Sequence, residues 1–225
     1  MGIVDLFIQR LGSFFPRKAL IAFLMVAAIS IFFAFRYDST FRAWVISAEG
    51  KDWKQSSEYV VATKLSKFGD WPELIGAGIL AALVARQLRS FAWSKIFAAA
   101  VISAMIAGGL ATTCRSLTGR TRPDADPAIA PGWYGPFHDG RLLLGVHSYN
   151  SFPSGHTATA VGLAAVILFT RPLWGAPCML IALFITASRL YLGKHHLSDV
   201  VVALFLGLAV GYLTTAWLRS SQTSQ

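Results

Sequence analysis

Six long apolar blocks, separated by short charged stretches, constrain the fold of this chain more than any other feature of its sequence. A helix needs roughly 17 to 25 mainly apolar residues to cross a bilayer core of about 30 Å. Lipid offers the backbone no hydrogen-bonding partner, so a spanning segment must satisfy its own polar groups, as a helix does. We therefore expect an all-α fold, a six-helix transmembrane bundle. Its helices are predicted at residues 19–35, 71–85, 96–113, 154–170, 173–188 and 200–217.

The composition of the chain excludes an ordinary soluble domain. Hydrophobic residues make up 55% of the 225 residues and charged residues only 14%, whereas soluble domains average about 25% charged residues. The net charge of +9 would suit a nucleic-acid-binding protein, but the basic residues alternate with long uncharged blocks. We expect a bilayer, and no nucleic acid, as the partner. The length indicates a single integral membrane domain over residues 1–225.

The N-terminal segment, residues 1–18, is dense in apolar side chains. We interpret it as a helix that lies along the membrane interface. The first apolar block follows Arg17 and Lys18 and ends at Arg36 without a cleavage site of small residues. This block is therefore expected to be a retained helix and not a signal peptide.

The loop between the second and third blocks indicates the orientation of the bundle. It carries Arg86, Arg89 and Lys95 and no acidic residue, and short loops rich in Lys and Arg remain on the cytoplasmic side. Both termini are then cytoplasmic. We expect a multi-pass protein of a bacterial inner membrane with a periplasmic active site, and a eukaryotic endomembrane is the alternative. The outer face would carry residues 36–70, 114–153 and 189–197.

The outer segment at residues 36–70 is too apolar for a floating loop, since it includes Trp44, Trp53 and Tyr59. One or two helices resting on the outer leaflet or capping the bundle would explain this composition. We predict a partly helical segment, and an ordinary ordered loop is the alternative.

Polar residues that fit poorly in an apolar protein gather at three places, all at the predicted outer ends of helices. One place is Pro-Ser-Gly-His at residues 153–156, where the fourth block begins. A serine before a long apolar run is typical of a helix N-cap, so Ser154 is expected to cap this helix. The free N–H groups of a helix N-terminus bind anions, and His156 stands beside them as a proton donor or acceptor. Simple capping is the alternative for this tetrapeptide.

The second place holds His195 and Asp199, four residues apart at the start of the sixth block. If both lie on the first turn of a helix, their side chains share a face. A carboxylate on one imidazole nitrogen would set the tautomer and leave the other nitrogen free as a nucleophile or base. A His–Asp contact that only caps the helix is the alternative.

The third place is a group of arginines between the third block and Pro123. It consists of Arg115, Arg120 and Arg122. A fourth, Arg189, follows the fifth block. Planar guanidinium groups suit the oxygens of a phosphate. A basic run at a membrane surface equally suits contact with lipid headgroups, which is the alternative.

The three motifs Arg-x6-Arg-Pro, Pro-Ser-Gly-His and Ser-Arg-x5-His-x3-Asp, in this order, resemble the signature of the type 2 phosphatidic acid phosphatase superfamily. They lie within residues 114–199, and the six-helix layout extends the resemblance over nearly the whole chain. The chain departs from the family in one respect, because Arg115 stands where the family usually has lysine. A forked guanidinium there replaces a point charge.

The resemblance implies a membrane lipid phosphate phosphatase. It implies that His195 attacks phosphorus to form a phosphohistidine and that Asp199 holds the imidazole. His156 would protonate the leaving oxygen and then activate water. Arg120 occupies a variable position of the first motif and is left out of the predicted site. The groups implied to bind the phosphoryl oxygens are Arg115, Arg122, Ser154, the Gly155 amide and Arg189.

No metal ion or other cofactor is expected. The few carboxylates near the motifs share no ligand spacing with a histidine. Arginines and a helix N-terminus supply the charge neutralisation that a divalent ion provides in other phosphatases. The reaction is therefore predicted to be metal-independent.

A 29-residue outer loop between Pro123 and Pro153 carries several aromatic and polar side chains. A loop of this length within a compact bundle is usually functional. A site at headgroup level favours a phosphorylated membrane lipid, and the candidates are polyprenyl diphosphates such as undecaprenyl diphosphate, phosphatidylglycerophosphate, phosphatidic acid and a lipid A-type glycolipid. A lipid-to-acceptor phosphotransferase with the same intermediate is the nearest alternative. A non-catalytic lipid-binding membrane protein is a more distant one.

Overall fold

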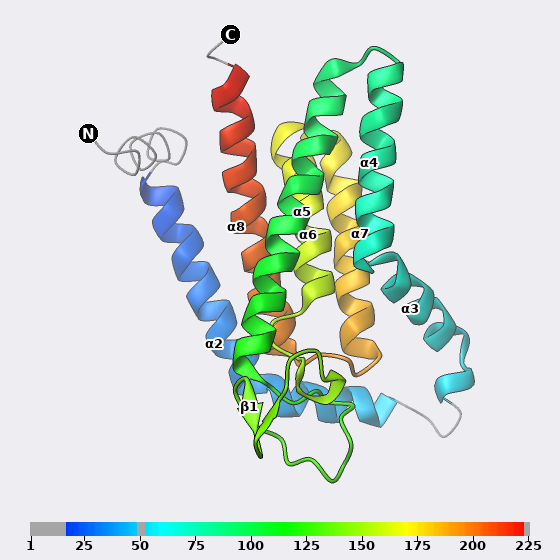
Figure 1. Ribbon diagram of the computed structural model, residues 1–225, viewed down its shortest axis with the longest axis vertical. Coiled ribbons are helices and arrows are strands. Elements are labelled where there is room, and N and C mark those ends of the chain that lie inside the picture. Colours follow the sequence, from blue (N-terminus) through cyan, green and yellow to red (C-terminus); the bar gives the residue numbers. More distant parts are fainter. Residues whose placement is uncertain (1–16, 49–52, 223–225) are drawn as a thin grey trace.

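The computed structural model describes residues 17–48 and 53–222, which are mainly helical (Figure 1). The interfacial helix predicted at residues 1–18 lies outside this part, apart from Arg17 and Lys18, which begin the first described helix. The expectation of a helical fold is confirmed. The helices are α2 (Arg17–Ala48), α3 (Ser57–Phe68), α4 (Trp71–Gln87), α5 (Phe91–Thr118), α6 (Gly155–Thr170), α7 (Pro172–Tyr191) and α8 (Leu197–Gln222).

Short elements of regular structure lie between these helices. Two 3-10 turns, η1 and η2, cover Trp53–Gln55 and His147–Tyr149. The outer loop forms a small antiparallel hairpin of β1 (Phe137–His138) and β2 (Arg141–Leu142), in which Phe137 pairs with Leu142.

Four of the described helices, α2, α5, α7 and α8, are long and apolar enough to cross a membrane. Helices α3 and α4 pass the same test only together, and they are bent by 59° at the break between them. Helix α6 has 16 residues, which is about 24 Å at 1.5 Å per residue and shorter than a bilayer core. Four or five spans therefore follow from length and composition, and the count of six stays a prediction.

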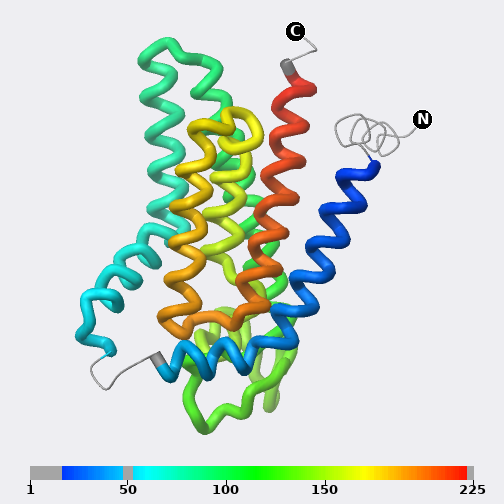
Figure 2. The backbone as a smooth tube through the Cα atoms, turned by 180° about the vertical axis from the view of Figure 1, so that it is seen from behind, coloured from blue at the N-terminus to red at the C-terminus, as the bar shows by residue number. Residues whose placement is uncertain are grey.

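Helix α6 forms the centre of the bundle, where α5, α7 and α8 pack around it (Figures 1 and 2). Its inner side chains are small, and Ala158, Val161 and Ala165 are completely buried. Small residues let helices approach closely in a membrane, where packing and not the hydrophobic effect drives association. Gly207 of α8 shows this approach, because a Cβ there would lie 2.9 Å from the carbonyl oxygen of Ala158. The first half of α6 is thereby packed closely against α8.

Helix α2 continues beyond the end of the first predicted span. It descends beside α8, where the rings of Phe23 and Phe205 meet edge to face with centroids 5.6 Å apart. It then turns and runs across the lower end of the bundle (Figures 1 and 2). Residues 36–48 contain no Pro or Gly that would end the helix. Together with α3, this extension confirms that the outer segment 36–70 is partly helical.

The start of α2 and the end of α8 lie at the same end of the molecule, and the hairpin and the α7–α8 turn lie at the opposite end (Figure 2). The α4–α5 turn, which contains Arg89, lies at the end where α8 finishes (Figure 1). This arrangement agrees with a topology in which the described ends of the chain share one side of the membrane.

Candidate active site

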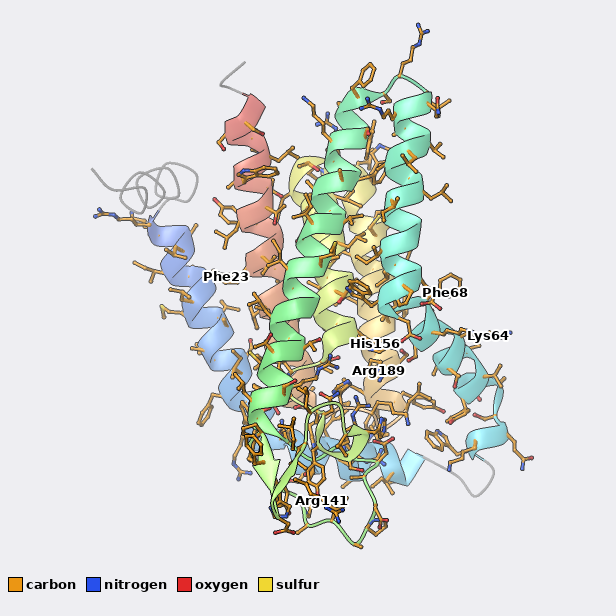
Figure 3. All side chains as sticks on the ribbon, viewed as in Figure 1. Phe23, Lys64, Phe68, Arg141, His156 and Arg189 are labelled. Carbon is orange, nitrogen blue, oxygen red and sulfur yellow. The ribbon has the colours of Figure 1, made fainter. Side chains whose placement is uncertain are left out.

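The three sequence motifs meet at the lower end of the bundle, where α5 ends, α6 begins and the α7–α8 turn passes (Figures 1 and 3). The amide of Ser154 donates to the carbonyl oxygen of Asp199 at 3.0 Å, which joins the second motif to the third. A Cβ at Gly155 would lie 2.9 Å from Nη2 of Arg115, so the first motif closely approaches the second. Stretches that are far apart in the sequence therefore form a single site.

The second motif begins α6 in the predicted way. Ser154 has an extended backbone with φ −68° and ψ 114°, and its Oγ accepts hydrogen bonds from the amide and the hydroxyl of Thr157. The prediction of a serine N-cap is confirmed. The first N–H groups of a helix have no acceptor within the helix, and they carry the positive end of its dipole. An anion can therefore bind at this terminus, beside His156.

Arg115 lies on the last turn of α5. The helix ends there because Gly119 has a φ of +55°, and a Cβ at Gly119 would lie 2.1 Å from the carbonyl oxygen of Gly135. Nη2 of Arg115 donates to Oγ1 of Thr112 at 2.7 Å. Its Nε is buried and has no hydrogen-bond partner among the described residues. The guanidinium therefore keeps a donor for an acceptor that residues 17–48 and 53–222 do not provide.

Arg122 and Arg189 bring two further guanidinium groups to the site. Nε of Arg122 donates to the carbonyl oxygen of Asn150 at 3.1 Å, and burial lowers the pKa of Arg122. Arg189 is 7% exposed and donates from Nη1 to Oγ of Ser66 in α3. Its Nε lacks a partner in the described part of the chain. An anion would relieve the repulsion between the half-buried Arg122 and the buried Arg189.

His195 is 2% exposed and lies in the turn before α8, which begins only at Leu197. The condition that both His195 and Asp199 lie on the first helical turn is therefore met only by Asp199. Its Nδ1 lies 2.9 Å from the carbonyl oxygen of Ser151 and 3.6 Å from Oδ2 of Asp199. A nitrogen that faces a carbonyl oxygen must carry the proton, so Nε2 has the lone pair. Nε2 is buried without a hydrogen-bond partner among the described residues.

Asp199 is completely buried and accepts hydrogen bonds from two groups beside His195. Its Oδ2 accepts from Oγ of Ser151 at 2.6 Å and from the amide of His196 at 2.8 Å. Direct hydrogen bonding to the imidazole was the sequence-based expectation, but 3.6 Å exceeds hydrogen-bond distance. Asp199 therefore acts on His195 through its charge and through Ser151.

Arg120 is a member of the site that the sequence-based reasoning left out. It is 8% exposed, and its Nη1 donates to Oδ1 of Asp199 at 2.5 Å. Its Nη2 donates to Oδ2 of Asp38 in α2 at 2.7 Å. No local pattern distinguishes Arg120 from the neighbouring arginines, and Asp38 lies outside the three motifs.

His156 has a carboxylate partner that was also missed. Its Nε2 lies 2.6 Å from Oδ1 of Asp70, which precedes the first residue of α4. The position of Asp70 before a Trp-Pro helix start predicts only an N-cap, and its side chain makes no capping hydrogen bond. Figure 3 shows His156 and Arg189 near the same level, below the middle of the bundle. The structure therefore supplies each of the two histidines with an acidic neighbour.

A cavity of about 670 Å3 lies beside His156, between the start of α4 and the second half of α5. Its walls include the exposed apolar side chains of Trp71 and Met105, which are 51% and 46% exposed. Arg115, Gly155 and His156 form its inner end. The described part of the chain thus offers a path from the apolar surface to the second motif.

The outer loop packs against the motifs and does not extend away from them. The amide of Arg122 donates to the carbonyl oxygen of Ser148 at 2.9 Å, and the amide of Ser151 donates to that of Arg120 at 3.2 Å. The ring of Trp133 covers the guanidinium of Arg120 at 4.7 Å. The loop therefore helps to bury the charged groups around His195. Among the residues described, no group of three His, Cys, Asp or Glu side chains could hold a metal ion.

The sequence is similar to those of known lipid phosphatases. The chain is 29% identical over 161 residues to a lipid A 1-phosphatase of Rhizobium johnstonii, a match that covers 67% of this chain and 64% of the relative. It is 35% identical over 150 residues to decaprenylphosphoryl-5-phosphoribose phosphatase of Mycobacterium tuberculosis, covering 67% of this chain and 75% of that protein. The chain spans less than two thirds of the length of the lipid A 1-phosphatases that it matches.

The fold is similar to the crystal structure of the first transmembrane PAP2 type phosphatidylglycerolphosphate phosphatase from Bacillus subtilis. The TM-score is 0.54, with 93% of this chain and 96% of that chain covered at 18% identity. This likeness and the apolar helices identify an integral membrane protein. The model of the PAP2 superfamily matches residues 76–222, which include all three motifs. The resemblance seen in the motifs is confirmed, and the chain belongs to the PAP2 superfamily.

Proposed function

We propose that this protein hydrolyses a phosphate or diphosphate group of a membrane lipid through a phosphohistidine intermediate on His195, without a metal ion. The observation that carries the proposal is Nε2 of His195, which is buried without a hydrogen-bond partner among the described residues. A buried acceptor without a partner is costly. An electrophilic phosphorus atom, held by the neighbouring guanidinium groups, would use this lone pair.

The first chemical step transfers the phosphoryl group to the enzyme. The lone pair of Nε2 of His195 attacks phosphorus, so that a P–N bond forms and the P–O bond to the leaving group breaks. Protonated His156 donates its proton to the leaving oxygen. In the substrate-free site, burial and the neighbouring positive charges lower the pKa of His156 to about 2. Protonation of His156 is therefore assigned to the substrate complex, where the phosphoryl charge and the Asp70 carboxylate, 2.6 Å away, favour the imidazolium.

The second step releases phosphate. His156, now neutral, takes a proton from a water molecule whose oxygen attacks phosphorus. The P–N bond breaks, and its electron pair returns to Nε2 of His195. Both imidazoles regain their initial protonation states, so the cycle closes without any further reactant.

Charge neutralisation is assigned to Arg115, Arg122, Arg189 and the N-terminus of α6. These donors are positioned before the substrate arrives, and such preorganised donors are usually the largest electrostatic contribution to catalysis. One donor is worth about 2.7 to 4 kcal/mol in a well-studied acyl-transfer enzyme. Metal independence is supported by this abundance of positive charge. Loss of activity after thorough chelation, restored by a divalent cation, would contradict it.

A lipid substrate is supported by the cavity between α4 and α5. Its exposed walls include the apolar side chains of Trp71 and Met105 beside Glu73 and Thr112, whereas its inner end reaches His156. A lipid could therefore stay in the bilayer while its phosphate reaches the site. The relatives named above act on lipid A and on a decaprenyl phosphate derivative. The candidates here are a polyprenyl diphosphate, phosphatidylglycerophosphate, phosphatidic acid and a lipid A-type glycolipid.

The proposed location is a bacterial inner membrane with the site on the periplasmic side. The basic α4–α5 turn lies at the end of the bundle opposite the motifs (Figure 1). Such basic loops remain in the cytoplasm. The relatives named above also come from bacteria.

Phosphate release from the four candidate lipids tests the proposal. The purified full chain in detergent should release phosphate from at least one of them without any added acceptor alcohol. The His195→Ala variant should be inactive but should be recovered in the same folded amount. Phosphate transfer only in the presence of an acceptor would indicate a phosphotransferase, and wild-type hydrolysis by His195→Ala would refute the assigned nucleophile.

A further inference from the structure

A network of buried charges joins α2 to the turn that carries His195, and its members Asp38 and Arg120 have no part in the steps of the proposed reaction. Arg120 stands at its centre. Nη2 of Arg120 donates to Oδ2 of Asp38 at 2.7 Å, and Nη1 donates to Oδ1 of Asp199 at 2.5 Å. The same Nη1 donates to Oγ of Ser198 at 2.7 Å. Two carboxylates from different helices therefore share one guanidinium.

Water has little access to this network. Arg120 is 8% exposed, Asp199 is completely buried, and the side chain of Asp38 is 13% exposed. Removal of one partner from such a buried group leaves an uncompensated charge, which is strongly unfavourable. The aromatic rings that surround the guanidinium are those of Trp133 at 4.7 Å, Phe35 at 5.5 Å and Phe152 at 5.9 Å.

The two carboxylates also satisfy the N-terminus of α8. Oδ1 of Asp38 accepts from the amide of Ser198 at 2.8 Å, and Oδ2 accepts from its hydroxyl at 2.6 Å. Oδ2 of Asp199 accepts from the amide of His196 at 2.8 Å. The first N–H groups of a helix need acceptors from outside the helix, and negative charge is favourable there. Asp38 thus caps α8 from another helix.

A second residue of α2 contacts the same turn. A Cβ at Gly193 would lie 3.0 Å from both Nη atoms of Arg42, and Gly193 has a φ of +64°. Asp38 and Arg42 are four residues apart, so they share a face of α2. This face contacts both sides of His195 in the sequence, at Gly193 and at Ser198.

We infer that Asp38 and Arg120 are positioning residues, which hold the His195 imidazole in place through Asp199 and the N-terminus of α8. The inference rests on the proposed function, because it requires His195 to be the nucleophile. Arg120 binds Oδ1 of Asp199, and Oδ2 of Asp199 accepts from the hydroxyl of Ser151 at 2.6 Å. The carbonyl of Ser151 in turn accepts from Nδ1 of His195 at 2.9 Å.

The experiment measures kcat and KM of Asp38→Asn, Arg120→Gln and the double variant with a lipid that the wild type hydrolyses. Each single substitution should lower kcat roughly 10 to 100-fold, the loss seen when a partner that orients a metal-binding histidine is removed. KM should change less than about threefold, because these residues lie outside the groups assigned to bind phosphate. Arg36→Gln is the matched control, since Arg36 is exposed on α2, and it should retain wild-type kinetics.

Coupling between the two positions separates positioning from a purely structural role. If they act on one path, the double variant should be no slower than the slower single variant, because contacting residues are not additive. Asp38→Glu keeps the charge and should recover part of the rate that Asp38→Asn loses. Wild-type kcat per folded molecule in Asp38→Asn, or multiplicative losses in the double variant, would overturn the inference. Should Arg120→Gln not fold, Asp38→Asn and Asp38→Glu still decide the question, because asparagine can accept from the Ser198 amide.

Wild type and His195→Ala, measured in the same assay, distinguish a failure of the proposed function from a failure of the positioning role. No hydrolysis by the wild type, or full hydrolysis by His195→Ala, would refute the proposed function itself. If these two behave as proposed while Asp38→Asn has the wild-type kcat, only the positioning role is refuted.

Discussion

Nδ1 of His195 lies 2.9 Å from the carbonyl oxygen of Ser151, whereas the nearer carboxylate oxygen of Asp199 lies at 3.6 Å. The backbone carbonyl, and not the carboxylate, therefore determines which imidazole nitrogen carries the proton. A carbonyl oxygen can only accept a hydrogen bond, so in the neutral imidazole the lone pair is on Nε2. The tautomer of His195 therefore does not depend on the charge of Asp199.

Asp199→Asn should lower kcat by roughly 100-fold, and not by the roughly 10⁴-fold seen where the carboxylate itself sets the tautomer in a Ser-His-Asp triad. The variant loses the negative charge that stabilises the phosphorylated imidazole, but it retains the Ser151 carbonyl. The measurement is kcat of the variant in detergent, with His195→Ala as the reference for complete loss. A loss as complete as that of His195→Ala would contradict the role assigned to Ser151.

Phosphoenzyme formation should tolerate acid unusually well. Burial lowers the pKa of His195 to about 4, against an ordinary value of 6.5, although the charge of Asp199 acts in the opposite direction. The neutral imidazole is the nucleophile, so it stays competent as the pH falls through 6.5 and loses its lone pair only near pH 4. The measurement is the rate of phosphoenzyme formation from a lipid diphosphate between pH 3.5 and 7. An acid limb centred near pH 6.5 would show that His195 titrates normally.

The same shift has a consequence for stability. The unfolded chain takes up a proton on His195 near pH 6.5, whereas the folded chain takes it up only near pH 4. The contribution of this group to folding stability is therefore lost progressively as the pH falls from 6.5 towards 4.

Gly155→Ala should reduce phosphate binding. The added Cβ would lie 2.9 Å from Nη2 of Arg115, so the guanidinium must move away from the N-terminus of α6. We expect KM for the lipid to rise at least several-fold, and kcat to fall as well if the same donor acts in the transition state. Gly76→Ala in α4 is the matched control, because a Cβ there meets no atom within 4 Å. Equal kinetics in the two variants would contradict the close approach of Arg115.

Asp70→Asn should impair poor leaving groups more than good ones. The carboxylate stabilises protonated His156, which must supply a proton to the leaving oxygen. A lipid alcohol needs this proton more than the phosphate leaving group of a diphosphate does. We expect the rate ratio between diphosphate and monoester lipids to rise in Asp70→Asn and also in His156→Ala. An unchanged ratio in both variants would remove His156 from the role of general acid.

Helix positions were largely predictable because the reason for them is local. The apolar blocks at residues 96–113 and 200–217 lie within α5 and α8, since lipid obliges an apolar segment to pair its own backbone groups. The N-cap at Ser154 was predictable for a similar reason, because a cap acts on residues of its own first turn. Helix α2 was predicted too short, because the exit from the membrane at Arg36 does not end a helix that lacks Pro and Gly.

The sequence alone determined the helical class, the approximate positions of the helices, the start of α6, the family motifs and the residue types that bear chemistry. Only the tertiary structure decided which groups are paired: Ser151 with His195, Asp70 with His156, and Arg120 with Asp38 and Asp199. A buried polar group takes whichever partner the fold brings within hydrogen-bond distance. Those partners stand 44, 86, 82 and 79 residues away along the chain, beyond the reach of any local pattern.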